Sequence, residues 1–256
     1  MNAMMRENVP AGAVKSSLRT LLILELFATE QKTLGLADIA RSLDMPKSSC
    51  LALLGTLTER GYLYKTTPDG GYYPTQRWLN NALRVAAHDP LAVRIHACLE
   101  RLARATGESA IHAVLAGDRS VYVDVVESGE TIRFSTRSGD TKPLHVSASG
   151  RAQLGTLPAE QLKAIVERIS LKSMSKRPDF TRRSLTRLIE EERERGWSCN
   201  LGDHNPDVLS VAAGLNLHGV AHSLVVAAPL TRAAPHVEKI GKLLRQEAEK
   251  LMQQLR

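Results

Sequence analysis

Several side chains in this sequence could do acid–base or nucleophilic chemistry, but they lack the spacing of a known catalytic motif. Histidine, aspartate and cysteine are available in the second half of the chain: His112, His145, Cys199, Asp203 and His204. None of them belongs to a nucleophile elbow, a phosphate-binding glycine loop or a zincin pattern. We therefore predict no catalytic residue and no cofactor, and we expect that the chain is not an enzyme.

Two histidine pairs are candidates for a metal site. His218 and His222 are four residues apart, but Gly219 and the hairpin pattern around them favour two surface histidines over helical ligands. His112 and His145 are each more typical of a core or turn histidine. We predict no metal ligands, and whether a metal occupies this half of the chain stays open.

Phosphate binding is a second kind of chemistry, and it is favoured where Lys47, Ser48 and Ser49 follow Pro46. Proline is common at the first position of a helix, so these residues would occupy a helix N-terminus, whose N–H groups and dipole suit an anion. Lys47 could neutralise a phosphate, and the serines could donate to phosphates or base edges. The predicted DNA-binding residues are Lys47, Ser48, Ser49, Leu51, Ala52, Thr56 and Lys65, with Arg77 as a further backbone contact.

The elements that would position these residues are three short helices. An apolar pattern from Leu18 to Phe27, after the N-cap candidates Ser16 and Ser17, predicts the first helix. Two further stripes repeat at i, i+3, i+4 and i+7: Leu36, Ile39, Ala40 and Leu43, then Cys50, Leu53, Leu54 and Leu57. Two short amphipathic helices joined by about three residues form a helix-turn-helix, whose second helix can enter the major groove.

A β-hairpin is expected directly after the third helix. Aromatic, β-favouring residues at 62–64 and 72–73 flank the turn-forming residues 67–71. Five of the ten aromatic residues lie between Tyr62 and Trp78, so the hairpin should be well packed. The pattern predicts a winged helix-turn-helix, and the alternative is the same element used only for contacts with a partner protein.

Length and composition exclude several classes of protein. The 256 residues are 43% hydrophobic and 24% charged, which is typical of a folded chain with one large or two modest domains. The longest apolar run is far shorter than the ~20 residues that span a bilayer, and the N-terminus has no signal-peptide pattern. The three cysteines, Cys50, Cys98 and Cys199, form no disulfide framework. We expect a cytoplasmic protein with no membrane partner.

The net charge of +7 permits a nucleic-acid partner but does not locate its surface. Residues 1–90 contain ten basic and eight acidic residues, a net charge of +2, so residues 91–256 account for +5. The densest basic stretch lies between Lys172 and Arg187, where a solvated loop and helix face are the simpler interpretation. The DNA-binding half therefore has few phosphate contacts, and tight binding should need two or more copies.

The rest of the chain reads as a linker helix and an α+β domain with an antiparallel sheet. Strands are expected at 110–116, 120–127, 131–137, 197–201, 208–215 and 220–227, and helices at 148–156, 159–169, 182–195 and from about 234. The predicted organisation is a disordered N-terminus (1–15), a winged helix-turn-helix (16–76), a linker helix (77–89) and an α+β domain (90–256).

The order and spacing of these motifs resemble the IclR family of bacterial transcription regulators. The matching segments are 18–24, 45–49, 53–63, 106–109, 121–124, 139–151 with its Pro143-Leu144-His145, and 227–232. The resemblance implies a GAF-like effector domain. It departs at Ala52, where the family commonly has arginine, so the operator sequence should not be borrowed from relatives. Ser147 and Arg151 replace threonine and lysine, which are mild changes.

The resemblance also implies where a small acid would bind. The corresponding residues are Ala148, Ser149, Gly150, Asn200, Ser210, Val225 and Ala227, with His112 and His145 on segments that border the cavity. This set is less acidic and more apolar than in relatives that bind keto acids, which suits a larger, flatter ligand. Arg133 or Arg137 could pair with a carboxylate, but alternation places both on the face opposite to Phe134 without saying which face is inward.

The predicted function is a ligand-responsive DNA-binding transcriptional regulator, with a repressor favoured over an activator. Its expected partners are double-stranded operator DNA, a small organic acid, aromatic acids among the candidates, and further copies of itself as a homodimer or dimer of dimers. Two alternatives stay open. One is an enzyme whose winged helix is an interaction module, and the other is a DNA-binding regulator that has lost its ligand.

Overall fold

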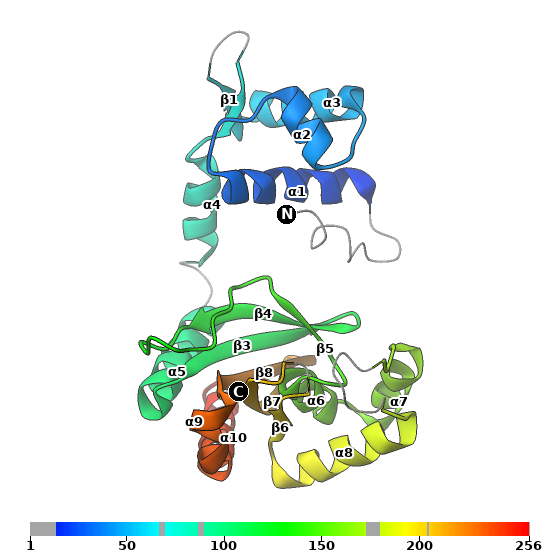
Figure 1. Ribbon diagram of the computed structural model, residues 1–256, viewed down its shortest axis with the longest axis vertical. Helices are drawn as coiled ribbons and strands as arrows, with labels where there is room; N and C mark the ends of the chain where they lie inside the picture. Colours follow the sequence, from blue (N-terminus) through cyan, green and yellow to red (C-terminus); the bar gives the residue numbers. More distant parts are fainter. Residues whose placement is uncertain (1–13, 67–69, 87–89, 173–179, 204, 256) are drawn as a thin grey trace. The chain divides into compact units, whose positions relative to one another are not determined.

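The chain forms two compact units, residues 1–89 and 90–256 (Figure 1). The computed structural model describes residues 14–66, 70–86, 90–172, 180–203 and 205–255. Residues 1–13 of the segment expected to be disordered, and the candidate His204, lie outside the described residues.

The first unit is a winged helix-turn-helix. Its elements are α1 (Lys15–Glu30), α2 (Leu36–Ser42), α3 (Lys47–Glu59), β1 (Leu63–Lys65), β2 (Tyr72–Pro74) and α4 (Arg77–Ala86). The expected stripes of α2 and α3 meet α1 in one core, in which Ile23, Ile39 and Leu54 are almost fully buried. The third helix begins at Lys47, one residue later than predicted. Pro46 has non-helical backbone angles and is the N-cap residue.

The wing is fastened to the linker helix α4 through its base. The indole N–H of Trp78 donates to the carbonyl of Tyr62 at 3.0 Å, and the two rings are 4.6 Å apart. The amide of Asn81 donates to the Tyr62 hydroxyl at 3.2 Å, and the hydroxyl of Thr75 donates to the carbonyl of Gly61. The aromatic residues therefore join wing and linker within one unit, which agrees with the expectation of a packed hairpin.

The second unit is built on a six-stranded antiparallel sheet with the order β5-β4-β3-β8-β7-β6. The strands are β3 (Ser109–Ala116), β4 (Arg119–Val126), β5 (Thr141–Pro143), β6 (Ser198–Leu201), β7 (Val208–Leu217) and β8 (Val220–Pro229). The helices are α5 (Pro90–Thr106), α6 (Ala148–Gly155), α7 (Ala159–Arg168), α8 (Arg182–Arg195), α9 (Leu230–Ala233), a 3-10 turn (Ala234–His236) and α10 (Val237–Gln254). The α+β architecture predicted from the sequence is confirmed.

Helices cover both faces of this sheet. Leu99 of α5 and Leu244 of α10 pack against Val211 and Val226 on one face, which we call the helix-pair face. Ala148 and Ala152 of α6 pack against Val225 and neighbouring residues on the other, which we call the α6 face (Figure 1). Because successive residues of a strand point to opposite faces, this division decides where each predicted site residue lies.

The strand expected at residues 131–137 is not present. Residues 133–137 have no regular secondary structure and form no ladder in the described chain, and β5 pairs with residues 119–121 of β4 instead. The segment is held by side-chain bonds: the hydroxyl of Ser109 donates to the carbonyl of Phe134 at 2.7 Å, and that of Thr136 donates to Asp140 at 2.6 Å. The strand β5, only three residues long, was not predicted.

Candidate DNA-binding surface and effector face

The exposed face of α3 contains most of the residues predicted to contact DNA. Lys47, Ser48, Leu51, Ala52 and Thr56 are exposed, and Ser49 is half-buried. Their apolar partners on the same helix turn inward, with Cys50 and Leu54 fully buried. The helix therefore presents to solvent a polar N-terminal end and, beyond it, a face of Leu51, Ala52 and Thr56 without a charged side chain. Both are what entry into a major groove requires.

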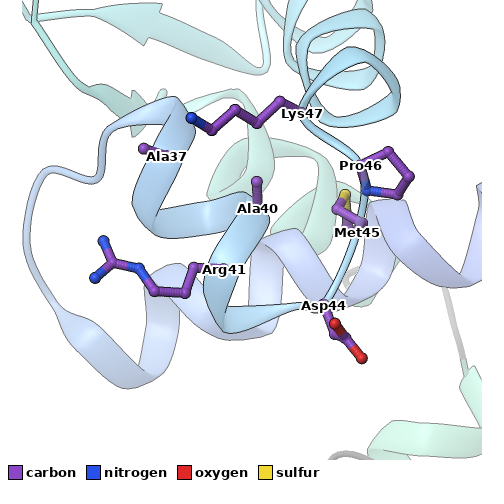
Figure 2. A pocket seen from close by; sticks show the side chains of 7 residues that line it. All are labelled: Ala37, Ala40, Arg41, Asp44, Met45, Pro46 and Lys47. Carbon is purple, nitrogen blue, oxygen red and sulfur yellow. The ribbon is translucent and has the colours of Figure 1, made fainter.

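A surface hollow of about 690 Å³ lies beside the N-terminus of α3 and adds a cation that sequence reasoning missed. It is lined by Ala37, Ala40, Arg41, Asp44, Met45, Pro46 and Lys47. Figure 2 shows Lys47 reaching over α2 towards Ala37, while the carboxylate of Asp44 points away. The guanidinium of Arg41 is exposed and pairs with Asp38 of its own helix. Arg41 could have been predicted from the sequence, because the apolar stripe of α2 places it on the outer face of that helix.

At the wing, Lys65 is exposed at the end of β1, with its ammonium 5.8 Å from the centre of the Tyr72 ring. The guanidinium of Arg77 lies 4.9 Å from the centre of the Tyr62 ring, at the base of the wing. Both cations rest on aromatic faces, which restricts their motion and keeps their charge at the surface.

On the α6 face, the structure brings together most of the predicted effector residues. The register pairs Asn200 with Ser210, Ser210 with Ala227, and Ala227 with Ser109, so these residues form one row across four strands. Val225 lies in the next row, between Ile111 and Ala212. Cross-strand neighbours share a face, so a polar row borders an apolar one.

The N-terminus of α6 lies against this face and brings Ala148, Ser149 and Gly150 to it. Ser147 caps the helix by accepting from the N–H of Gly150 at 3.1 Å. Gly150 packs directly on the backbone of Leu144, where a β-carbon would collide. Ser149 forms a side-chain hydrogen bond with Tyr122, whose burial raises the pKa of its hydroxyl. Both Tyr122 and Phe134 contribute rings to the apolar cluster here.

Arg133 and His112 are not brought to this face. Phe134 packs on the cluster, so Arg133 points the other way, and it pairs with the exposed Glu127 at 3.2 Å. Arg137 is also directed to solvent, with 87% of its side chain exposed. His112 is paired in register with Leu224 of the helix-pair face.

His112 and His222 form a buried pair on the helix-pair face. The Nε2 of His112 lies 2.8 Å from the Nδ1 of His222, so one ring donates to the other. Burial, and then the charge of His222, lowers the pKa of His112 to about 4. Burial likewise lowers the pKa of His222, which is therefore not the surface histidine that the sequence favoured. His218 is exposed in the two-residue turn of this hairpin.

His145 lies behind the α6 face, with its Nε2 3.0 Å from the carbonyl of Lys172 and its ring edge-on to Phe180. Its carbonyl accepts from Arg151, which is 1% exposed and forms a two-point ion pair with Glu192 of α8 at 2.9 and 3.1 Å. Arg151 also donates to the carbonyl of Cys199, next to Asn200. This network ties α6, α8 and β6 together behind the predicted site.

The described residues contain no group of three or more histidine, cysteine or acidic side chains arranged to hold a metal ion. No helix among the described residues is long and apolar enough to cross a membrane. A second hollow, of about 400 Å³, lies at the end of α5 and is lined by Glu100, Arg104, Glu127, Glu130 and neighbouring residues, none of them predicted for the effector.

Comparisons with known proteins decide the family. The family model for the C-terminal part of the bacterial transcriptional regulator IclR matches residues 83–253, and the IclR helix-turn-helix model matches residues 16–67. The chain belongs to the IclR family of bacterial transcriptional regulators. The resemblance drawn from the motifs is thus confirmed, and so is a role in DNA-binding transcription regulation.

Similar proteins span nearly the same length. The probable transcriptional regulator SauR of Cupriavidus necator is 26% identical over 219 residues, covering 85% of this chain and 87% of its own. The transcriptional repressor IclR of Escherichia coli is 25% identical over 205 residues, covering 79% and 74%. An IclR homologue of Microbacterium hydrocarbonoxydans, solved with 4-hydroxybenzoate, has a TM-score of 0.76 at 21% identity and covers 94% and 98%. The solved homologue shares the fold of this chain.

Proposed function

We propose that this IclR-family chain represses transcription by binding operator DNA as a homodimer or dimer of dimers, and that a small organic acid modulates that binding. The observation that supports it most directly is the exposed N-terminal face of α3, with Lys47 and Ser48 outward over a closed three-helix core. The family is one of regulators, so we propose no catalytic role. Binding chromosomal DNA would also place the protein in the cytoplasm.

On DNA, we expect α3 to enter the major groove, with Ser49, Leu51, Ala52 and Thr56 closest to the base edges. Lys47 and Arg41 would contact phosphates on one side of the groove, and Lys65 and Arg77 would contact the backbone near the wing. The Ala52 position offers only a methyl group. Specificity should therefore come from apolar contacts and the serines more than from an arginine–guanine pair.

The ligand is proposed to bind at the α6 face, among Ser149, Asn200, Ser210, Val225 and Ala227. This site offers an apolar cluster with a few polar groups at its border, which is the composition of small-molecule sites. A structural neighbour was solved with 4-hydroxybenzoate, an aromatic acid, which supports the same class of ligand here. A ligand can shift repression only by binding differently to two arrangements of the paired DNA-binding units. Trp78, between wing and linker, is the proposed route for that coupling.

The test of DNA binding starts from selection of double-stranded sequences by the full-length protein. On a selected site, Lys47→Ala should weaken binding and reduce the slope of log K against log salt concentration by about one, because one phosphate contact is lost. The matched control is Lys163→Ala, which removes an exposed lysine from α7 of the other unit.

An unchanged salt slope for Lys47→Ala would exclude this lysine as a phosphate contact. Failure of the wild-type protein to select any sequence over random DNA would overturn the proposed regulator itself. A reporter gene placed behind the selected site then tests the sign of regulation, with higher expression expected when the protein is absent.

A further inference from the structure

One lysine, Lys142, lies beside the aromatic side chains of the α6 face. It is the central residue of β5, and its cross-strand neighbour on β4 is Ser120, so the two side chains share a face with Tyr122 two residues on. Its ammonium nitrogen is 5.5 Å from the centre of the Tyr122 ring and 6.0 Å from that of Phe134. Both rings belong to the cluster that includes Val225 and Ala227.

Among the residues that the structure describes, no acidic side chain forms an ion pair with this ammonium group. It lies over the rings of Tyr122 and Phe134, and the charge of Asp140 raises its pKa while that of Arg119 lowers it. The side chain is half-buried, and burial lowers its pKa. A partly desolvated cation without a counter-ion is costly unless an anion completes its environment.

A second observation at the same place is an unsatisfied polar atom. The hydroxyl of Ser120, in a residue that is 0% exposed, has no hydrogen-bond partner in the described chain. Such groups are uncommon in folded proteins and often mark an absent ligand or water. On this face, then, the described residues hold a cation without an ion pair and a hydroxyl without a hydrogen bond, next to an apolar cluster edged by Ser149 and the Tyr122 hydroxyl.

We propose that Lys142 binds the anionic group of the effector, with Ser120 as a supporting donor and the rings of Tyr122 and Phe134 packing on its apolar part. The ligand class is thereby narrowed to small carboxylates with an aromatic or branched body. The inference rests on the proposed function, in which this face binds an organic acid. Arg133 and Arg137, the cations considered from sequence, point to solvent and are not needed for it.

The test compares acids with their amides on the full-length protein. The probes are benzoate, 4-hydroxybenzoate, phenylacetate and butyrate, each paired with its uncharged amide, and affinity is measured by calorimetry and thermal shift. We expect Lys142→Met to weaken binding of the best acid by about tenfold or more and to leave its amide within about threefold. Lys142→Arg should retain most of the acid affinity, and the control Arg137→Gln should change neither.

Three results would overturn the assignment: no acid of the panel binds the wild-type protein, Lys142→Met binds acids as the wild type does, or Arg137→Gln loses the acid instead. The melting temperature of each ligand-free variant shows whether it folds. If Lys142→Met does not fold, Lys142→Arg still tests the role of the positive charge. Selection of DNA by the same protein preparations distinguishes failure of this inference from failure of the proposed function. Intact DNA binding without acid binding removes this inference alone, whereas acid binding without sequence-selective DNA binding removes the proposed regulator.

Discussion

Two imidazole rings, His112 and His222, share a hydrogen bond inside the second unit, and this pairing has a consequence for stability in acid. Burial holds both in the neutral form, because a charged imidazole would be desolvated there. The pKa of His112 falls from 6.5 to about 4 on folding. Between these two pH values the unfolded chain binds a proton that the folded chain does not.

We therefore predict that the second unit loses stability as the pH falls from 6.5 towards 4. The lowered pKa of His112 corresponds to a decrease of roughly 3 kcal/mol at most in the free energy of unfolding. His112→Gln should make the melting temperature fall less steeply over this window, since glutamine cannot take up the proton. His236→Gln, at an exposed histidine, is the control and should leave the slope unchanged. Equal slopes for wild type and His112→Gln would contradict the buried neutral pair.

At the scale of elements, two helical glycines with ordinary backbone angles have opposite surroundings. A β-carbon on Gly150 would collide with the backbone of Leu144, whereas one on Gly55, within α3, would meet nothing within 4 Å. The close approach at Gly150 is what allows α6 to lie against the sheet beside Tyr122. The same glycine-to-alanine change should thus have opposite effects in the two helices.

Gly150→Ala is predicted to destabilise the second unit by about 1–3 kcal/mol, because the start of α6 must shift. Gly55→Ala is predicted to stabilise the first unit by up to about 1 kcal/mol, because alanine favours the helix and meets no obstacle. Urea denaturation of each variant measures both changes. Stabilisation by both substitutions would show that α6 does not depend on this contact.

At the scale of the whole molecule, the sparse charge of the DNA-binding unit makes self-association important. Its net charge of +2 offers few phosphate contacts per copy. We predict that the full-length protein binds a site with two half-sites about 10² to 10⁴ times more tightly than one in which the second half-site is scrambled. Fluorescence anisotropy with both DNAs tests this, alongside the mass of the free protein in solution. Equal affinities would mean that one copy suffices.

The sequence by itself determined the first unit and most of the helices and strands of the second. Stripes at helical spacing, a proline before Lys47 and turn residues between aromatic runs are local signals, and local signals predict local elements. The helix at 182–195 was predicted with its observed bounds. In the structure Thr181 caps it and Gly196 ends it with a left-handed conformation, so both of its ends are set locally. The strand predicted at 131–137 was wrong, because side-chain hydrogen bonds, such as that from Ser109 to the carbonyl of Phe134, hold this segment in place of a backbone ladder.

The tertiary structure alone decided which faces point inward. Alternation in the sequence separates Arg133 from Phe134, but only the packing of Phe134 on Val225 and its neighbours shows that Arg133 is outside. The same holds for His112, which joins His222 under the helix pair, and for Lys142, whose strand is too short to show a pattern. A period of two distinguishes two faces but does not say which of them is covered. That depends on contacts with strands and helices far away in the sequence.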